Sequence, residues 1–441
     1  MKNGKKAALL AAVFLVVLAF GACNRGSGPA AKGGVREIVF WDMMWGPAQT
    51  YPAAMGEIVN RYNSSNPDNI HVTLQTVPWD NFYQVFLTAV TSKAAPDVST
   101  GAFMQSIQFA EMGEGLSLDP VVDAWKKENN PILNDYSEAI FNLHMYDGKH
   151  YGLPWNLDTR QFTYRKDYFE KAGITKLPAT WAEFEEACAK LKAALPADTY
   201  PVIFPGGGDY NGLHAIITFF VQNDTGATDA QGNPDYLNPR ITETLQFINR
   251  LYVKGYIPEG FPAYRGTDAE KLFQSGKAAM YLHNAIDLRD FPDIEAVGGI
   301  LPPMAGPSGK AQNYTWVNAI EAFSQTKDPE ACHAFIKWLL ENEGDLWEKS
   351  GLGALPARAS LRQRPYFTDR WATREISELV LPTVVSVCHP SPSIFLPFSI
   401  IEGEAIPMIG MVNACVANPD YRAIQQDVQD RMLKAWAEFE M

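Results

Sequence analysis

Short apolar strands alternate with amphipathic helices through residues 35–112, and this alternation constrains the fold more than any other feature. The first apolar run, 38–41, is followed from Pro47 by a helix whose apolar residues recur at helical spacing. The next expected elements are a strand at 70–74, a helix at 79–90, a strand beginning at 96–98 and a helix at 103–112. Strands and helices that alternate at this spacing form parallel βαβ units. The sequence therefore predicts an α/β fold.

The first 22 residues have the organisation of an export signal. Three lysines among the first six residues precede an uncharged run over 7–20, which is shorter than the roughly 20 residues of a transmembrane helix. Residues 20–23, Phe-Gly-Ala-Cys, resemble a lipobox in which Phe stands in place of the usual Leu. We expect a signal peptide over 1–22, a lipid-modified Cys23 and a flexible tether over 23–35. The alternative is ordinary cleavage near Ala22, with no special role for Cys23.

The size and charge of the remaining chain limit its architecture and partners. From Cys23 onward there are about 420 residues, more than a single core usually holds, so two lobes are expected. Without the signal lysines the chain has 34 basic and 50 acidic residues, a net charge of −16. Such a chain repels nucleic acid and anionic lipid. We therefore expect neither a nucleic-acid partner nor membrane contact beyond a lipid anchor.

Four further cysteines leave the disulfide pattern open. They are Cys188, Cys332, Cys388 and Cys415, which allow up to two disulfides in an exported protein, in three connectivities. Cys188 and Cys332 lie in helical patterns and are interpreted as small buried side chains. The pairs Cys332-His333 and Cys388-His389 do not bring ligands together at one metal without distant help. We predict no metal site and no cofactor.

Several short blocks of sequence follow one another in an order typical of a single protein family. The most specific is Tyr-Arg-Lys-Asp-Tyr-Phe-Glu-Lys-Ala-Gly at 164–173, with Leu-Pro-Ala-Thr-Trp at 177–181. A turn and strand at 146–154, the run Gly-Lys-Ala-Ala-Met at 276–280 and the loop at 351–358 accompany it. In this order the blocks resemble the family 1 extracellular solute-binding proteins, the lipid-anchored sugar receptors of ABC importers. The resemblance covers nearly all of 36–441.

The resemblance implies a two-lobed periplasmic-binding-protein fold of type II. Each lobe is expected to be a mostly parallel sheet flanked by helices, and the chain is expected to cross between lobes three times. The crossings are predicted near 154–160, 279–283 and 320–323. Lobe one would then comprise 36–155 plus 284–320, and lobe two 156–283 plus 321–441. Closure of the lobes about this hinge would enclose a ligand.

The resemblance also indicates where that ligand binds, in loops at the ends of strands. A sugar requires flat aromatic rings against its apolar faces, with carboxylates, amides and arginine for its hydroxyls. The candidate contacts of these types are Trp41, Asp42, Trp45, Gln105, Trp155, Asp158, Asp209, Tyr210, Asn284, Trp316 and Arg358. A metal ion would require clustered His, Asp and Glu instead, so this set favours carbohydrate.

Structural roles remain open for several of these residues. Trp41 and Trp316 have the alternative of packing in a core, and Arg358 that of a salt bridge between lobes. Asp42 and Asp158 have the alternative of bracing the strands beside them. His283, at the end of the 278–282 strand, is interpreted as a hinge residue rather than a ligand contact.

Together these features predict a monomeric, extracytoplasmic receptor of an ABC importer. It would capture a carbohydrate, expected to be an oligosaccharide, and deliver it to the transmembrane permease subunits. Lipid-anchored, it would sit on the periplasmic face or the cell surface. One alternative keeps the fold and changes the solute to a polyamine, peptide or metal chelate. The other is a carbohydrate-active enzyme, which needs two opposed carboxylates; the sequence has no motif that pairs them, and it lacks Gly-x-Ser-x-Gly and His-Glu-x-x-His.

Overall fold

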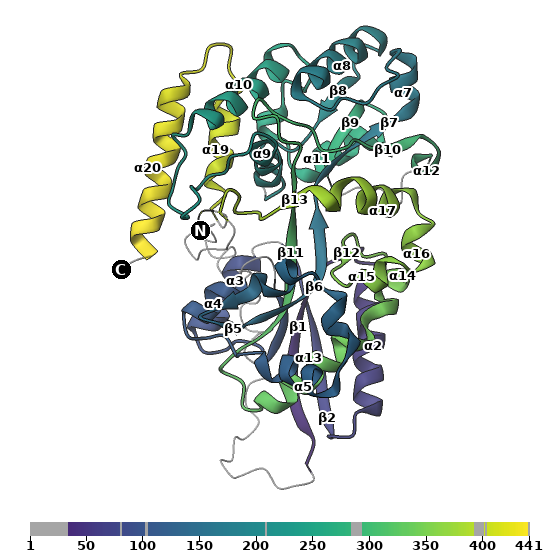
Figure 1. Ribbon diagram of the computed structural model, residues 1–441, viewed down its shortest axis with the longest axis vertical. Helices are drawn as coiled ribbons and strands as arrows, with labels where there is room; N and C mark the ends of the chain where they lie inside the picture. The colour runs from purple at the N-terminus through teal and green to yellow at the C-terminus, as the bar shows by residue number, and fades with distance from the viewer. Residues whose placement is uncertain are drawn as a thin grey trace, which may run out of the picture.

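The computed structural model describes residues 34–79, 82–101, 105–207, 210–283, 293–391, 401 and 404–439. Figure 1 shows two lobes stacked along the long axis, each a β-sheet with helices packed around it. Strands β6 and β11 both extend from the body of lobe one to the boundary with lobe two, in opposite chain directions. The predicted two-lobed α/β architecture is what the described residues form.

Lobe one, the lower half of Figure 1, contains a seven-stranded sheet in the order β12-β6-β11-β3-β1-β2, with β13 also paired to β11. Its elements are β1 (Arg36–Met43), α2 (Tyr51–Ser65), β2 (Ile70–Val77), α3 (Phe82–Thr91), β3 (Val98–Gly101), α4 (Gln105–Glu111), α5 (Asp119–Glu128), η1 (Pro131–Asp135), α6 (Glu138–Phe141), η2 (Asn142–His144), β4 (Met145–Tyr146), β5 (Lys149–His150), β6 (Gly152–Thr159), β11 (Asn313–Ala322), α13 (Pro329–Asn342), η5 (Glu343–Asp345), α14 (Leu346–Ser350), β12 (Leu355–Pro356) and α15 (Ala359–Arg362). The short strands β4 and β5 form a separate hairpin.

Lobe two is built on a four-stranded sheet in the order β10-β7-β9-β8. Its elements are β7 (Gln161–Arg165), α7 (Lys166–Lys171), α8 (Trp181–Ala194), β8 (Tyr200–Ile203), α9 (Tyr210–Gln222), α10 (Pro239–Val253), η3 (Phe261–Ala263), α11 (Gly266–Gln274), β9 (Ala278–His283), α12 (Ile294–Val297), β10 (Gly298–Ile300), α17 (Trp371–Glu375), η6 (Ile376–Val380), η7 (Leu381–Thr383), α19 (Ile406–Asn413) and α20 (Tyr421–Phe439). Between the lobes lie α16 (Pro365–Thr368) and β13 (Val384–Val385).

Local sequence signals account for several elements of lobe two. Helix α8 begins where Thr180 Oγ1 accepts a hydrogen bond of 3.2 Å from the backbone N–H of Glu183, the contact for which threonine is favoured just before a helix. Helix α11 ends shortly before Gly276, whose φ of +70° is left-handed and therefore favours glycine. Strand β9 follows directly, so the strand expected at 278–282 is present.

Both sheets are mixed rather than mostly parallel, which corrects one part of the expected fold class. In lobe one β1 pairs in parallel with β2 and β3, whereas β11 is antiparallel to β3 and β6. In lobe two β7 is antiparallel to β9 and β10. The reason is the hinge: β6 carries the chain out of lobe one and β11 returns it, so these neighbouring strands run in opposite directions.

The second crossing lies later than 279–283, so the predicted start of the returning segment at residue 284 is wrong. Strand β10 follows β9 and pairs with β7 inside the sheet of lobe two. The backbone N–H of Ala305 also still bonds Ala179 of lobe two, at 2.9 Å. The chain rejoins lobe one only at β11. The sequence of a short buried strand does not tell which sheet it enters.

The third crossing also lies later than the predicted 320–323. After β11, helix α13 packs on α5, α2 and β1 of lobe one, and Arg36 of β1 donates to Asp328 at the start of α13. Helix α14 packs on α2, and β12 pairs with β6. The chain reaches lobe two through α16 and α17, where α17 lies against β10. Residues 321–362 therefore belong to lobe one, and not to lobe two as predicted.

Cys188, Cys332, Cys388 and Cys415 are all buried, and among the described residues Cys188, Cys332 and Cys415 form no disulfide. Cys188 lies in α8 and Cys332 in α13, which confirms their interpretation as small buried side chains on helices. Burial raises the pKa of Cys332 and of Cys415 to about 12 in each case, so these thiols stay protonated and unreactive at neutral pH.

Candidate functional site

A cleft of about 940 Å³ opens between the lobes. Lobe one contributes the loop after β1, Trp79 and the end of α14, and lobe two contributes α11 and His283. The α16–α17 connection completes the lining. The lining residues are Met44, Trp45, Gly46, Pro47, Gln49, Thr50, Trp79, Glu270, His283, Glu348, Lys349, Ser350, Gly351, Tyr366 and Arg370. A cavity of this size, between domains and lined by both, is typical of a small-molecule site.

The wall from lobe one is built of tryptophans that pack edge-to-face or tilted against one another. Trp79 is 37% exposed, and its ring meets the buried ring of Trp45 edge-on at 4.9 Å. Trp155 backs Trp45 at 5.4 Å and is itself packed against Trp347 at 6.1 Å. Trp79 Nε1 donates to the carbonyl of Met44 at 2.6 Å. The chain thus presents a rigid, partly exposed aromatic surface to the cleft, suited to the apolar face of a sugar ring.

Hydrogen bonds behind this wall fix the loop that follows β1. Asp42 is fully buried, and its Oδ1 accepts from Thr100 Oγ1 at 2.7 Å and from the Tyr51 hydroxyl at 3.1 Å. Thr100 Oγ1 accepts in turn from Trp45 Nε1 and from the backbone N–H of Met43, both at 3.0 Å. Burial raises the pKa of Asp42 to about 7, opposed by its two hydroxyl donors.

The opposite wall, from lobe two and the α16–α17 connection, mixes aromatic and charged groups. The guanidinium of Arg370 lies 4.3 Å from the ring centre of Tyr366, a cation–π contact. His283 stacks on Tyr281 at 5.0 Å. On the opposite side Lys349 pairs with Glu57 at 2.8 Å, and Glu348 with Arg364 at 2.7 Å. The imidazole of His283 and the guanidinium of Arg370 are planar polar groups that line the same cleft as the tryptophans. Groups of this kind are suited to the recognition of hydroxyl groups.

Of the predicted candidates that the structure describes, only Trp45 lines this cleft. Trp155 and Trp316 are each 1% exposed. Trp41 packs on Phe86 and donates to Gln75 at 2.8 Å. Asp42 and Gln105 are also buried. As ligand contacts these residues stay predictions.

The other candidates lie elsewhere. Asp158 forms an ion pair with Arg160 where β6 leads into β7. Arg358 pairs with Asp135 at 2.9 Å within lobe one, rather than between lobes, and both line a separate polar depression of about 530 Å³. Tyr210 begins α9. Asp209, Asn284 and Cys23 lie outside the described residues.

Several residues of the cleft escaped prediction from sequence. Trp79 looked like the start of an amphipathic helix, although its position after Pro78, directly beyond the strand β2, was a usable signal. His283 was interpreted as a hinge residue and in fact lines the cleft. Tyr366 and Arg370 lie in a connection whose sequence carries no ligand-binding motif. Only the third crossing brings them to the cleft.

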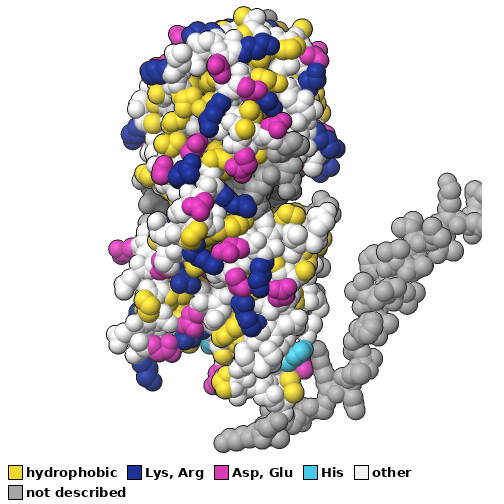
Figure 2. Space-filling model, turned by 90° about the vertical axis from the view of Figure 1, so that its right-hand side faces the viewer, with side chains coloured by type: hydrophobic (Ala, Val, Ile, Leu, Met, Phe, Trp, Pro, Cys, Tyr) yellow, Lys and Arg dark blue, Asp and Glu magenta, His cyan; other side chains and the backbone are white. Residues whose placement is uncertain are grey.

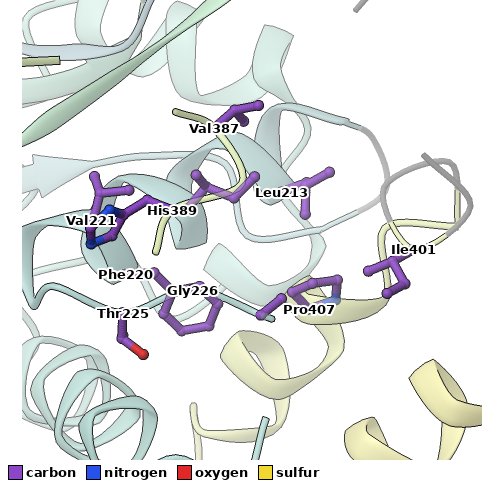
Figure 3. Close-up of a pocket in the computed structure, with 11 residues that line it drawn as sticks. Leu213, Phe220, Val221, Thr225, Gly226, Val387, His389, Ile401 and Pro407 are labelled. Atoms are coloured by element: carbon purple, nitrogen blue, oxygen red, sulfur yellow. The ribbon is translucent and has the colours of Figure 1, made fainter. Parts of the chain in front are cut away.

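Two further observations limit what else the chain could bind. A second pocket lies in lobe two beside α9, lined mainly by apolar residues and His389 (Figure 3), and its volume of about 10 Å³ leaves room for no more than about one water. Among the described residues no three His, Cys, Asp or Glu side chains are grouped so that they could hold a metal ion. The cleft between the lobes is therefore the candidate site.

Comparison with known sequences identifies the family. The profile of the bacterial extracellular solute-binding proteins matches residues 46–345, about two thirds of the chain. The chain belongs to this family. As a solute-binding protein it acts outside the cytoplasm, and within the described residues every helix is too short or too polar to span a membrane.

Relatives of this solute-binding protein are distant in sequence. A binding protein of Brucella abortus is 25% identical over 318 residues, which are 71% of this chain and 74% of the relative. The arabinooligosaccharide-binding protein of Halalkalibacterium halodurans is 26% identical over 255 residues, 55% of this chain and 51% of the relative.

Solved structures share the fold over almost the whole length. A sugar transporter of Arthrobacter chlorophenolicus with bound laminaribiose has a TM-score of 0.81 at 26% identity, covering 91% of this chain and 99% of that one. The sugar-binding protein MalE of Xanthomonas citri has a TM-score of 0.73 at 22% identity, covering 92% and 98%. These similarities confirm the expected two-lobed solute-binding fold.

Proposed function

We propose that this protein is the sugar receptor of an ABC importer and holds an oligosaccharide in the cleft between its lobes. The observation that supports this most directly is the pairing of a tryptophan wall from lobe one with planar polar groups from lobe two. Relatives named for arabinooligosaccharide binding, and a similar structure that holds laminaribiose, support the same class of ligand.

In this proposal each wall has a distinct task. The ring of Trp79 stacks on a sugar ring, with Trp45 behind it, while His283 and Arg370 bond hydroxyl groups. The two walls belong to different lobes, so the ligand makes its full set of contacts only when the lobes close. The closed form would be the one that the permease recognises.

The wider setting is part of the proposal. The protein would be tethered to the membrane by lipid on Cys23 and act as a monomer. Figure 2 shows basic and acidic side chains interspersed over one face of the molecule, without a continuous basic stripe, in keeping with the net negative charge and against a nucleic-acid partner.

The function is tested by a thermal-shift panel followed by calorimetric titration. Laminaribiose, arabinooligosaccharides, a polyamine mixture and short peptides would each be added to the purified protein. A ligand at one hundred times its dissociation constant adds roughly 2.7 kcal/mol, which raises the melting temperature by a few degrees. Stabilisation by a polyamine or peptide, with every oligosaccharide inert, would overturn the sugar assignment.

The enzyme alternative has a specific test, because two carboxylates face the cleft. Glu270 lines it from lobe two and Glu348 from lobe one, while a glycoside hydrolase uses such a pair as acid and base. Glu348 is exposed and forms an ion pair of 2.7 Å with Arg364. Prolonged incubation with labelled oligosaccharides should return them intact. Hydrolysis that disappears in Glu348→Gln would instead support an enzyme.

A further inference from the structure

We propose that Asp42 and Thr100 are positioning residues that hold the ring of Trp45 in the wall of the cleft. Neither side chain lines the cleft itself, and Asp42 is wholly enclosed. Their effect on a ligand would therefore be indirect, mainly through the ring of Trp45 and also through the end of β1 that Thr100 holds. The inference rests on the proposed function, since it assigns Trp45 to sugar binding.

The hydroxyl of Thr100 uses its full bonding capacity in this arrangement. A threonine hydroxyl has one proton to donate and two lone pairs to accept with. The proton goes to Asp42 Oδ1 at 2.7 Å, and the lone pairs accept from Trp45 Nε1 and the Met43 N–H at 3.0 Å each. Because the carboxylate oxygen takes the proton, the hydroxyl is oriented to accept from the indole.

The same contacts tie the ring to the frame of lobe one. Asp42 lies in β1, Thr100 in β3, and Tyr51, the second donor to Asp42, begins α2. Met43 is the last residue of β1, so Thr100 fixes the backbone at the end of the strand as well as the ring two residues later. The orientation of Trp45 is thus set by two strands and one helix of lobe one, rather than by its own loop.

Loss of the Thr100 hydroxyl would remove the hydrogen bond that holds the ring of Trp45 in its orientation. Thr100→Val keeps the shape of the side chain and leaves the indole N–H and the Met43 N–H buried without an acceptor. The indole can regain a hydrogen bond by turning toward water in the cleft. Its edge-to-face contact with Trp79 would then be disturbed, and the surface offered to a sugar would change.

The first experiment needs no ligand. Protein labelled with ¹⁵N-tryptophan gives one indole N–H signal per ring, and the signal absent from Trp45→Phe is that of Trp45. In Thr100→Val we expect this signal to move upfield and its exchange with D₂O to accelerate about tenfold or more. Thr100→Ser should restore both values. An unmoved Trp45 signal in folded Thr100→Val would overturn the positioning role of Thr100.

Asp42 is tested by a milder change. Asp42→Asn keeps an oxygen acceptor for Thr100 but removes the charge, so the Trp45 signal should move in the same direction by less. A matched control is Thr244→Val, because Thr244 is equally buried and its hydroxyl bonds only its own helix, at 2.9 Å to the carbonyl of Arg240. That variant should lose stability and leave the Trp45 signal in place. An Asp42→Asn spectrum identical to wild type would remove Asp42 from the proposal.

The second experiment connects the position of the ring to binding, with laminaribiose as the probe. Thr100→Val should weaken its affinity about five- to one-hundredfold, the range expected for a buried donor left unpaired. In a Trp45→Phe background the same substitution should cost much less affinity, because the indole N–H is absent and only the Met43 N–H still loses its acceptor. Equal losses in both backgrounds would contradict a route through Trp45. Failure of wild type to bind laminaribiose or any other oligosaccharide would count against the proposed function alone, and the indole signals would still decide the positioning.

Discussion

Exposure separates the tryptophans that can bind a ligand from those that hold the fold. Trp79 is 37% exposed and lines the cleft. Trp316, a candidate ligand contact from sequence, is 1% exposed and packs against Tyr314 and His214. Both side chains are tryptophans, so substitution by alanine removes the same atoms from each. The loss should affect ligand affinity at Trp79 and stability of the fold at Trp316.

Trp79→Ala should lower sugar affinity and leave the ligand-free protein stable. A stacked ring lost from the cleft should cost about 1–3 kcal/mol of binding, or one to two decades in affinity. Trp316→Ala should instead cost about 3–5 kcal/mol of unfolding free energy, because it opens a cavity in a packed region. Titration calorimetry and melting of the ligand-free variants measure both. A Trp316→Ala protein that melts like wild type but binds weakly would return Trp316 to the site.

A second effect at the scale of a residue comes from Glu321, a buried carboxylate of β11. Its Oε1 accepts from Ser99 Oγ at 2.9 Å, and burial raises its pKa to about 8. The folded state therefore keeps a proton that the unfolded chain loses above a pH of about 4.5. Stability from this group is complete below that pH and is lost as the pH rises through about 8.

Glu321→Gln should consequently change stability in a way that depends on pH. At pH 5 the variant should unfold at nearly the same urea concentration as wild type. At pH 9 it should be more stable by a few kcal/mol, the scale of cost for an unpaired buried charge. Glu330→Gln is the control, since that side chain is 91% exposed. An equal effect of Glu321→Gln at both pH values would show that the carboxylate is not buried as described.

Local elements were the part of the fold that the sequence predicted best, because their signals lie within a few residues. The cap of α8 depends on the single residue Thr180, and the left-handed turn before β9 depends on the single residue Gly276. The same holds for α13, whose cap at Asp328 accepts from the backbone N–H of Ala331 at 3.1 Å.

Gly276→Ala should destabilise the protein by about 1–2 kcal/mol, because an L-residue pays that cost at a left-handed φ. An added Cβ would also lie 3.1 Å from the hydroxyl of Tyr168. The matched control is Gly56→Ala in the middle of α2, where an added Cβ meets nothing within 4 Å. That change should stabilise by about 0.5–1 kcal/mol. Urea unfolding of both variants checks the opposite signs.

The pairing of elements across the chain was less predictable. Strand β10 has three residues, and nothing in Gly-Gly-Ile tells that it joins β7 rather than the sheet of lobe one. Likewise the amphipathic face of α13 fits any core, and only its contacts with α5 and α2 place it in lobe one. Both crossings were misplaced for this reason, while the first, a single step from β6 to β7, was near its predicted position.

The same limit applies to the site. Trp45 was predicted because it directly follows an apolar strand, a local signal. Tyr366 and Arg370 were missed because they reach the cleft only through the late third crossing. A sequence shows which strands are followed by polar or aromatic residues. It does not show which distant segment, here the α16–α17 connection, forms the opposite wall of the cleft.

At the scale of the whole molecule the three connections between lobes form a hinge. Binding of a sugar should therefore bring the lobes together without changing secondary structure. Small-angle scattering should show a smaller radius of gyration at saturation, with an unchanged far-ultraviolet circular dichroism spectrum. Trp79→Ala, measured at the same sugar concentration, serves as the control with reduced closure. Superimposable scattering profiles with and without bound sugar would contradict closure as the signal to the permease.

The proposed attachment to the membrane also belongs to this scale, and it is expected to depend on Cys23. Cys23→Ser should release the protein into the soluble fraction with its sugar affinity unchanged, because the residues that line the cleft begin only at Met44. Fractionation after a salt wash, followed by titration, measures both. Retention of the variant in the membrane would place the anchor elsewhere.

The late third crossing also affects how the chain acquires its structure. Lobe one needs residues 36–159 together with 313–362, and lobe two needs 161–300 together with the segment from α17 to α20. Neither lobe is a continuous stretch of sequence. During synthesis, which starts at the N-terminus, each lobe must therefore wait for a later segment before its core is complete. Until β11 arrives, β3 and β6 have free edges that invite pairing with other chains. Contacts of such long sequence separation slow folding. The helices from α17 to α20, which lobe two needs to complete its core, are also synthesised last.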